Sequence, residues 1–249
     1  MINVKVVHFN TWGGIGGAYI ASNRLHQALI DLGVESILGY GKSLNGSDSK
    51  IKYSNSYKVL PKKYQHIENF LSQSAKRLGL NDIGKISSLF VNHEEYINQA
   101  DLINLHNLHS NYFSYLVLPK LTSDKPAIWT LHDMWSFTGH CAYSYDCSRW
   151  KIGCGQCPYP NVQPAIRRDA TDWEWKLKNW VYSRSNLTIV TPSRWLGKQA
   201  QQSMLNRFAI HHIPYGIDTE AYQPLDPQLC RTVLAISHHK HILMFGAQS

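Results

Sequence analysis

Strand-like and helix-like segments alternate repeatedly along this 249-residue chain, and few folds accommodate such an alternation. The strand pattern VKVVHF (4–9) precedes a glycine-rich stretch, a helical repeat of apolar residues over 18–32, and a second strand pattern at 34–40. Further predicted strands lie at 100–106, 126–132, 187–191 and 208–213, and further predicted helices at 111–121, 170–185 and 192–205. Such alternation forms a parallel sheet covered on both faces. We therefore predict an α/β protein with a Rossmann-like, doubly wound parallel sheet.

Two regions interrupt this alternation. Residues 41–95 are polar and contain an amphipathic segment at 61–80, for which a surface helix is the simpler interpretation and a membrane-surface helix the alternative. After residue 222 the chain restarts a strand pattern, HILMF (241–245), followed by Gly246. We predict one domain at 1–222, and at 223–249 a linker with the first strand of a second, truncated domain.

The net charge of +8 is concentrated in one part of the chain. Residues 149–207 contain ten Lys or Arg but three Asp or Glu, which favours an anionic partner, with a solvated basic face as the alternative. No segment approaches the roughly 20 apolar residues that span a bilayer, and no signal peptide pattern opens the chain. We predict a cytoplasmic protein, with peripheral contact at the inner face of an anionic membrane as a hypothesis.

The first strand-to-helix connection, NTWGGIGGA, contains four glycines. Glycines allow close backbone approach, and the N-terminus of the following helix offers unpaired N–H groups to an anion such as a diphosphate. Tyr19 stands where the dinucleotide-binding fingerprint requires its third glycine, so an NAD enzyme is disfavoured. The alternative is a tight turn that needs glycine for its shape alone.

Histidines end two of the predicted strands. His106, with His109 close behind, follows the strand at 100–106, and His132 is followed by Asp133 at the end of 126–132. If these strands are parallel neighbours, His106 and His132 emerge on the same edge of the sheet as the glycine-rich connection. Asp133 would either orient an imidazole or cap the segment that follows it.

Four cysteines, Cys141, Cys147, Cys154 and Cys157, have the spacing C-x5-C-x6-C-x2-C. The C-x2-C half is typical of structural zinc, and four thiolates leave no open coordination position. We predict a structural zinc ion. The alternatives are that His140 replaces one ligand, that the cysteines are buried and reduced, or that two of them form a disulfide.

Six segments, in chain order, carry a resemblance to a known family: GGIGGAYIASNRLHQAL, DLINLHNLH, WTLHDMWSFTGHCAY, CSRWKIGCGQCP, TPSRWL and IPYGID. They resemble the N-terminal domain of GT-B fold, family 4 glycosyltransferases, especially those that build bacterial exopolysaccharide, colanic-acid-like or lipopolysaccharide glycans. The resemblance implies a glycosyltransferase of the hexosyltransferase type. Such an enzyme transfers a sugar, with retention, from a nucleotide-sugar donor to a glycan or lipid-linked acceptor.

The resemblance also implies roles for individual residues. It places Gly16 and Gly17 near the donor phosphates and His132 near the reacting sugar, as a catalytic residue. It places His106 in the same cleft and Ser193 with Arg194 towards the hinge. The segment PYGID, with Tyr215 where many relatives have asparagine, would lead to the second domain.

The resemblance finally implies that most of the donor-binding machinery lies in the second domain, so we expect the 249-residue chain by itself to lack activity. One rival hypothesis is a non-catalytic sugar-binding or scaffold fragment. Another is a zinc-containing nucleic-acid-binding module, which explains the cysteines and the charge but neither the glycines nor the strand-end histidines. We predict no nucleic-acid partner.

Overall fold

The computed structural model describes residues 4–43, 56–58 and 64–245. Its centre is a seven-stranded sheet in the order β3-β2-β1-β4-β5-β6-β7, with every neighbouring pair parallel. The strands are β1 (Lys5–Gly13), β2 (Glu35–Ser43), β3 (Ser56–Lys58), β4 (Leu102–Leu105), β5 (Ala127–Thr130), β6 (Thr188–Thr191) and β7 (Ala209–His212). The predicted parallel α/β sheet is confirmed.

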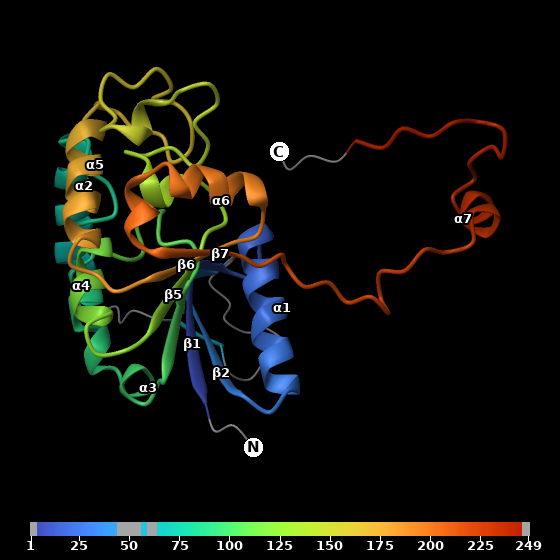
Figure 1. The fold of residues 1–249 in the computed structure, drawn as a ribbon, viewed down its shortest axis with the longest axis horizontal. Helices are drawn as coiled ribbons and strands as arrows, with labels where there is room; N and C mark the ends of the chain where they lie inside the picture. Colours follow the sequence, from blue (N-terminus) through green and yellow to red (C-terminus); the bar gives the residue numbers. More distant parts are fainter. Residues whose placement is uncertain (1–3, 44–55, 59–63, 246–249) are drawn as a thin grey trace. The chain divides into compact units, whose positions relative to one another are not determined.

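Helices cover both faces of this sheet (Figure 1). The α-helices of this unit are α1 (Gly17–Asp31), α2 (Gln65–Arg77), α3 (Glu95–Asn98), α4 (Leu118–Leu121), α5 (Thr171–Tyr182) and α6 (Arg194–Gln201). Short 3-10 turns are η4 (Ile86–His93), η5 (Tyr115–Val117), η6 (Trp135–Phe137), η7 (Arg149–Lys151) and η8 (Met204–Arg207). In Figure 1, α1 lies on one side of the sheet and α2, α4 and α5 lie on the other, which is the doubly wound arrangement. In the described part of the chain, no helix combines the length and the apolar character needed to cross a membrane.

The core lies on both sides of the central strands. Phe9 of β1, Ile103 of β4 and Ile189 of β6 are fully buried, and Trp129 of β5 is nearly so. Strands that are buried on both faces read as continuous apolar runs, which is why the sequence pattern located them. Because neighbouring strands are parallel, their carboxyl ends meet at one edge of this buried sheet.

Two predicted elements are absent or reduced. The helix expected at 111–121 forms only η5 and the single turn of α4, because Pro119 cannot continue a helix that precedes it. The strand expected at 241–245 is not formed: within the described residues no strand pairs with it, and Leu243 is 99% exposed. The short elements β3 and η4 within the polar stretch 41–95, and α3 at its end, were not anticipated. Lys62 and Lys63 of the amphipathic segment lie outside the described residues.

The chain divides into two compact units, Met1–Tyr215 and Gly216–Ser249. The sheet and its helices belong to the first unit. The second unit contains α7 (Pro227–Val233), whose N-terminus is capped by the Asp226 side chain, which accepts a hydrogen bond from the backbone N–H of Leu229 at 2.7 Å. That residues 223–249 begin a donor-binding domain stays a prediction.

Candidate functional site

Three histidines and a tyrosine form a continuous chain of polar contacts at the carboxyl edge of the sheet. His8 Nδ1 lies 3.2 Å from His106 Nε2, and His106 Nδ1 lies 2.9 Å from His132 Nε2. His132 Nδ1 lies 2.5 Å from the hydroxyl of Tyr215. The rings are stacked, with successive centroids 5.5, 5.2 and 5.5 Å apart. Because β1, β4 and β5 are parallel neighbours, the structure places His106 and His132 together as the sequence predicted, and it adds His8 behind them.

Burial keeps these imidazoles neutral. It lowers the pKa of His8 to about 3, with a further decrease from nearby His26, and lowers the pKa of His132 to about 4 against the opposing effect of Asp133. It also lowers the pKa of His106 well below the ordinary value, and His132 and His8 act in the same direction. Each neutral ring has one N–H and one lone pair, so every hydrogen bond in the chain must run in the same direction.

The end of the chain at His8 favours one of the two directions. His8 Nε2 is buried and has no hydrogen-bond partner among the described residues. A buried N–H without a partner is rarer than an unsatisfied acceptor, so the proton of His8 belongs on Nδ1. His106 and His132 then also carry their protons on Nδ1, and Tyr215 accepts from His132 while its own hydroxyl hydrogen is available to a ligand.

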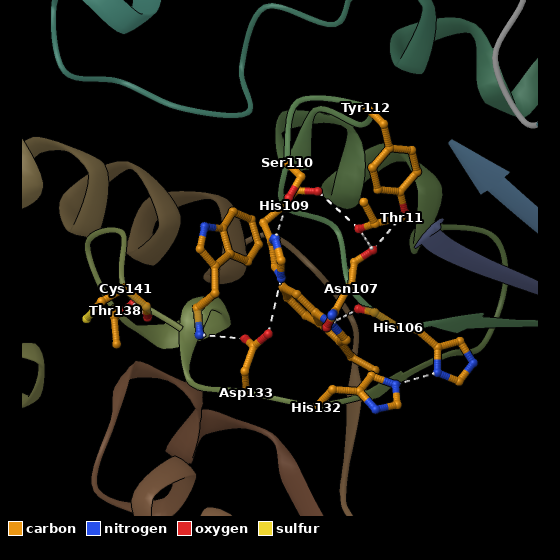
Figure 2. A network of polar contacts seen from close by, with 12 residues as sticks. Thr11, His106, Asn107, His109, Ser110, Tyr112, His132, Asp133, Thr138 and Cys141 are labelled. Carbon is orange, nitrogen blue, oxygen red and sulfur yellow. Dashed lines mark hydrogen bonds and ion pairs between the residues drawn. The ribbon is translucent and has the colours of Figure 1, made fainter. Parts of the chain in front are cut away.

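A second network lies beside the first. Asp133 Oδ2 lies 3.1 Å from His109 Nε2, and Asp133 Oδ1 accepts a hydrogen bond from the backbone N–H of Trp135 at 2.9 Å. His109 Nδ1 lies 2.9 Å from the hydroxyl of Ser110. Figure 2 shows His109 between Asp133 and Ser110. Asp133 therefore has both roles that the sequence left open, but the imidazole it orients is His109 and not His132.

The loop after β4 is fastened to β1 and β2. The Thr11 hydroxyl lies 3.0 Å from the backbone carbonyl oxygens of both Asn107 and His109, and the Tyr112 hydroxyl donates to the same Asn107 carbonyl at 2.9 Å (Figure 2). A Cβ atom at Gly41 in β2 would lie 2.0 Å from the Tyr112 ring. Only glycine therefore lets the ring pack against β2, which fixes the loop carrying His109.

The glycine-rich connection leaves the N-terminus of α1 open. Gly14 and Gly16 have φ values of +91° and +88°, so the turn does need glycine for its shape. Gly16 caps α1 without a side-chain hydrogen bond, and the first turn contains no acidic residue. A Cβ atom at Gly14, Gly16 or Gly17 would meet nothing within 4 Å. Among the described residues, neither backbone conformation nor space therefore requires a glycine at position 17, and no described atom lies within 4 Å of a Cβ at the start of α1.

Ser193 and Arg194 follow β6 and are both exposed. The Ser193 hydroxyl accepts a hydrogen bond from the backbone N–H of Leu196 at 3.2 Å, so its visible role is to cap α6. Arg194 begins the helix at the same edge of the sheet.

The four cysteines of the C-x5-C-x6-C-x2-C pattern lie together. With His140 they line a cavity of about 20 Å³ in the segment between β5 and α5. His140 Nε2 lies 3.2 Å from Cys157 Sγ, and Cys154 Sγ accepts the backbone N–H of Gly139 at 3.2 Å. All of these thiols are free, so the disulfide alternative is not what the structure contains. Within the described residues, no three His, Cys, Asp or Glu side chains already stand in a metal-binding arrangement.

A buried charged group beneath the site escaped the sequence pattern. The ammonium of Lys178 donates to the carbonyl oxygens of Trp135 at 2.7 Å and Thr138 at 3.0 Å. One turn earlier on α5, Glu174 accepts the Tyr115 hydroxyl at 2.9 Å, and burial raises the pKa of Glu174 to about 7. Glu and Lys four residues apart look like an exposed helix pair, which is why their role was missed.

The fold of this chain is similar to that of a solved structure. Sucrose-phosphate synthase from Thermosynechococcus elongatus superposes with a TM-score of 0.53 over 94% of this chain and 53% of that chain, at 12% sequence identity. At this identity the likeness concerns the fold alone. It defines the class of this chain: a Rossmann-like domain of the GT-B type, as predicted.

The sequence comparisons give the family. The model of Glycosyltransferase Family 4 matches residues 15–221, and the chain belongs to that family. It is 30% identical over 176 residues to WcaC of Escherichia coli (strain K12), which carries the name of a colanic acid biosynthesis glycosyl transferase. That match covers 67% of this chain and 42% of the relative, so the chain spans less than half the length of this curated relative.

Proposed function

We propose that the protein containing this chain transfers a sugar, with retention, from a nucleotide-sugar donor to a hydroxyl of a glycan or lipid-linked acceptor during the synthesis of a cell-surface polysaccharide. The observation that carries the proposal is the convergence of the open α1 N-terminus and the histidine chain at one edge of the sheet. That edge lies outside the carboxyl ends of β1 and β4, where the strand order changes direction and open α/β sheets bind their ligands.

The donor diphosphate belongs at the start of α1. The unpaired N–H groups and the positive end of the helix dipole stabilise a diphosphate, both bound and as it leaves with its nucleoside. Gly16 and Gly17 allow the phosphates to approach the backbone, since no atom of the described segments lies within 4 Å of the positions that their Cβ atoms would take. This support is independent of the family match.

His132 contacts the reacting sugar or the acceptor in this proposal. Its ring is neutral, and its Nε2 is held by His106, which is held in turn by His8. His106 and His8 are positioning residues that set the tautomer of His132 and the plane of its ring. A hydrogen-bond donor stabilises a transition state most when its orientation is fixed before the reaction, because no reorganisation is then needed.

Replacement of His132 by glutamine tests this function. In the whole protein, with a membrane lipid extract as acceptor and a panel of uridine and guanosine diphosphate sugars, we expect release of nucleoside diphosphate to fall at least about 100-fold. His66→Gln on the exposed surface of α2 is the matched control and should retain activity. An unchanged rate in the His132 variant, or no transfer by the unmodified protein, would contradict the proposal.

We also propose that the four cysteines bind one structural zinc ion. Four thiolates complete the tetrahedral coordination that zinc prefers, and a cavity of about 20 Å³ holds one small ion. Positive φ values at four consecutive residues, 153–156, turn the backbone sharply between Cys154 and Cys157, both of which line the cavity. Because the side chains do not yet stand at ligand distances, binding requires rotation of the thiols into the cavity.

The zinc proposal is tested by the metal content of protein purified without chelator. We expect about one zinc per chain in the unmodified protein and less than about a tenth in Cys157→Ser. Cys230→Ser, in the second unit, is the matched control and should keep the metal. Loss of zinc in His140→Gln with retention in Cys147→Ser would contradict the four-cysteine ligand set, and absence of zinc from the unmodified protein would contradict the site altogether.

We further propose a cytoplasmic location with peripheral contact at the inner face of an anionic membrane. Support comes from α2, which exposes 56% of Ile67 and 71% of Phe70 and has Lys76 and Arg77 in its last turn. We expect co-sedimentation with phosphatidylglycerol liposomes at low salt, reduced by Phe70→Ser. The control is Leu32→Ser, an apolar position next to α1 that is 80% exposed. An equal loss in both variants would contradict a specific role of α2.

A further inference from the structure

An open pocket of about 550 Å³ lies on the segment between β5 and α5, apart from the histidine chain. Its wall includes Tyr143, Tyr145, Tyr159, Asn161 and Gln163. A volume of this size falls within the range of about 300–1,000 Å³ that small-molecule sites occupy. None of its lining residues belongs to the histidine chain.

The wall of this pocket is a continuous group of aromatic rings. The Tyr143 and Tyr145 centroids lie 5.0 Å apart, and those of Tyr145 and Tyr159 lie 5.3 Å apart. Trp195, at the start of α6, stacks on Tyr143 with centroids 5.8 Å apart and an angle of 28° between the planes. Tyr143, Tyr145 and Tyr159 line the pocket, and Trp195 extends this wall through its contact with Tyr143. We call these four residues the aromatic pocket.

These rings remain accessible to solvent. Tyr143 and Trp195 are each 48% exposed, and Tyr145 is 61% exposed. Large apolar side chains gathered on a surface mark a binding site more often than scattered ones do. The rings are also held in place: Tyr143 packs between Tyr145 and Trp195, and the Tyr159 hydroxyl donates to Asp146. The aromatic pocket is therefore a preformed surface.

The chemistry of the pocket selects its ligand. None of the residues that line it carries a charge, which disfavours phosphate groups. The negative face of an aromatic ring attracts the positively polarised C–H groups on the flat face of a pyranose. The amides of Asn161 and Gln163 can donate and accept hydrogen bonds with sugar hydroxyls. Flat apolar faces with a few neutral polar groups at the edge suit an uncharged sugar.

The position of the pocket relates it to the proposed reaction. Trp195 follows β6, His132 follows β5, and the glycine-rich connection follows β1, which is separated from β6 by β4 and β5. With neighbouring strands about 4.8 Å apart, β1 and β6 are about 14 Å apart. Trp195 thus lies on the opposite side of His132 from the phosphate-binding helix end.

We propose that the aromatic pocket binds an uncharged saccharide unit of the glycan acceptor. Its assignment to the acceptor depends on the proposed function, because it follows from the position of the donor phosphates. Binding of the sugar itself follows from the rings and the uncharged wall alone. The two parts therefore need separate measurements.

The test uses the 249-residue chain and a panel of uncharged oligosaccharides of glucose, galactose and mannose, observed by saturation-transfer NMR. We expect transfer to ring C–H protons in the unmodified chain and binding about 2- to 10-fold weaker in Tyr143→Ala and in Trp195→Ala. The matched control is Trp173→Ala on α5, since Trp173 is 68% exposed and outside the pocket. Uridine and guanosine diphosphate, titrated into the same samples, should bind all four proteins equally.

Four results would overturn the proposal. The first three are absence of oligosaccharide binding by the unmodified chain, binding by both pocket variants as tight as by the unmodified chain, and an equal loss in the Trp173 control. The fourth is weaker nucleotide binding in the pocket variants, because the pocket would then serve the donor. If the oligosaccharide binds to the chain but the whole protein transfers no sugar in the assay used for the His132 variant, the proposed function fails while the sugar-binding pocket stands.

Discussion

Replacing Lys178 by methionine removes a buried ammonium while keeping most of the side-chain volume. Lys178 is fully buried, donates hydrogen bonds to two carbonyl oxygens at 2.7 and 3.0 Å, and lies 3.7 Å from the centroid of the Trp135 ring. These carbonyls belong to Trp135 and Thr138, where the chain leaves β5 and turns towards the cysteines. The substitution therefore tests what holds that segment on α5.

The expected loss of stability is about 3–5 kcal/mol. Each hydrogen bond from a charged group contributes about 1.5–3 kcal/mol to stability. Removing one of two buried, interacting charges costs about 3–5 kcal/mol. Methionine has a similar length, so little is added for a cavity. Since Glu174 raises the pKa of Lys178 against the effect of burial, the two charges are coupled. Glu174→Gln in the Lys178 variant should therefore recover part of the loss.

Urea unfolding followed by tryptophan fluorescence measures this difference. Lys176→Met is the matched control: it is exposed, its contact is an ion pair with Asp172 at 3.3 Å on the surface of the same helix, and its loss should stay below about 1 kcal/mol. A loss below about 1 kcal/mol in Lys178→Met would refute the reasoning, because the two carbonyl groups would then be satisfied without the ammonium. An equal loss in both variants would show an effect of helix propensity instead.

Two further predictions concern the same edge of the sheet. The rings of His8 and His132 should stay neutral in ¹⁵N NMR spectra at pH 5.5, where a histidine of ordinary pKa is about nine-tenths protonated. Because the unfolded chain binds these protons and the folded chain does not, each ring contributes stability that is present above pH 6.5 and is reduced by about 1.4 kcal/mol at pH 5.5. Burial raises the pKa of Glu174 to about 7, which acts on stability in the opposite direction, so each ring must be observed separately. A protonated His8 at pH 5.5 would contradict its burial. Gly41→Ala should lower the free energy of unfolding by about 1–3 kcal/mol in the urea assay, because its Cβ would overlap the Tyr112 ring, whereas Gly17→Ala, which meets open space, should cost far less.

The sequence predicted what depends on strand direction. His106 and His132 could be placed together because the carboxyl ends of parallel neighbours meet at one edge. His8 could not, because it lies within β1 and joins the chain through a contact between side chains 98 residues apart in sequence. A histidine inside an apolar strand was the available signal, since such a position usually holds an apolar residue.

Apolar spacing also failed where the local backbone or the side-chain rotamers decided the outcome. The helical spacing at 111–121 was overruled by Pro119 and by the left-handed φ values of Ser110 and Asn111, which start the loop. The cysteine spacing correctly gathered four thiols around one cavity, but spacing alone does not determine the rotamers of the sulfur atoms. The turn at the glycine-rich connection could be predicted because glycine adopts the positive φ values of Gly14 and Gly16 without strain.

The Tyr215 hydroxyl competes with any ligand for Nδ1 of His132. Tyr215 is the last residue of the first unit, and its hydroxyl occupies the outermost nitrogen of the histidine chain. A ligand that binds Nδ1 of His132 must first displace this hydroxyl. Loss of the hydrogen bond between His132 and Tyr215 costs about 1 kcal/mol, which weakens ligand binding roughly fivefold. Whatever moves the backbone at residue 215 therefore changes how readily His132 is available to a ligand, without any contact of its own with that ligand.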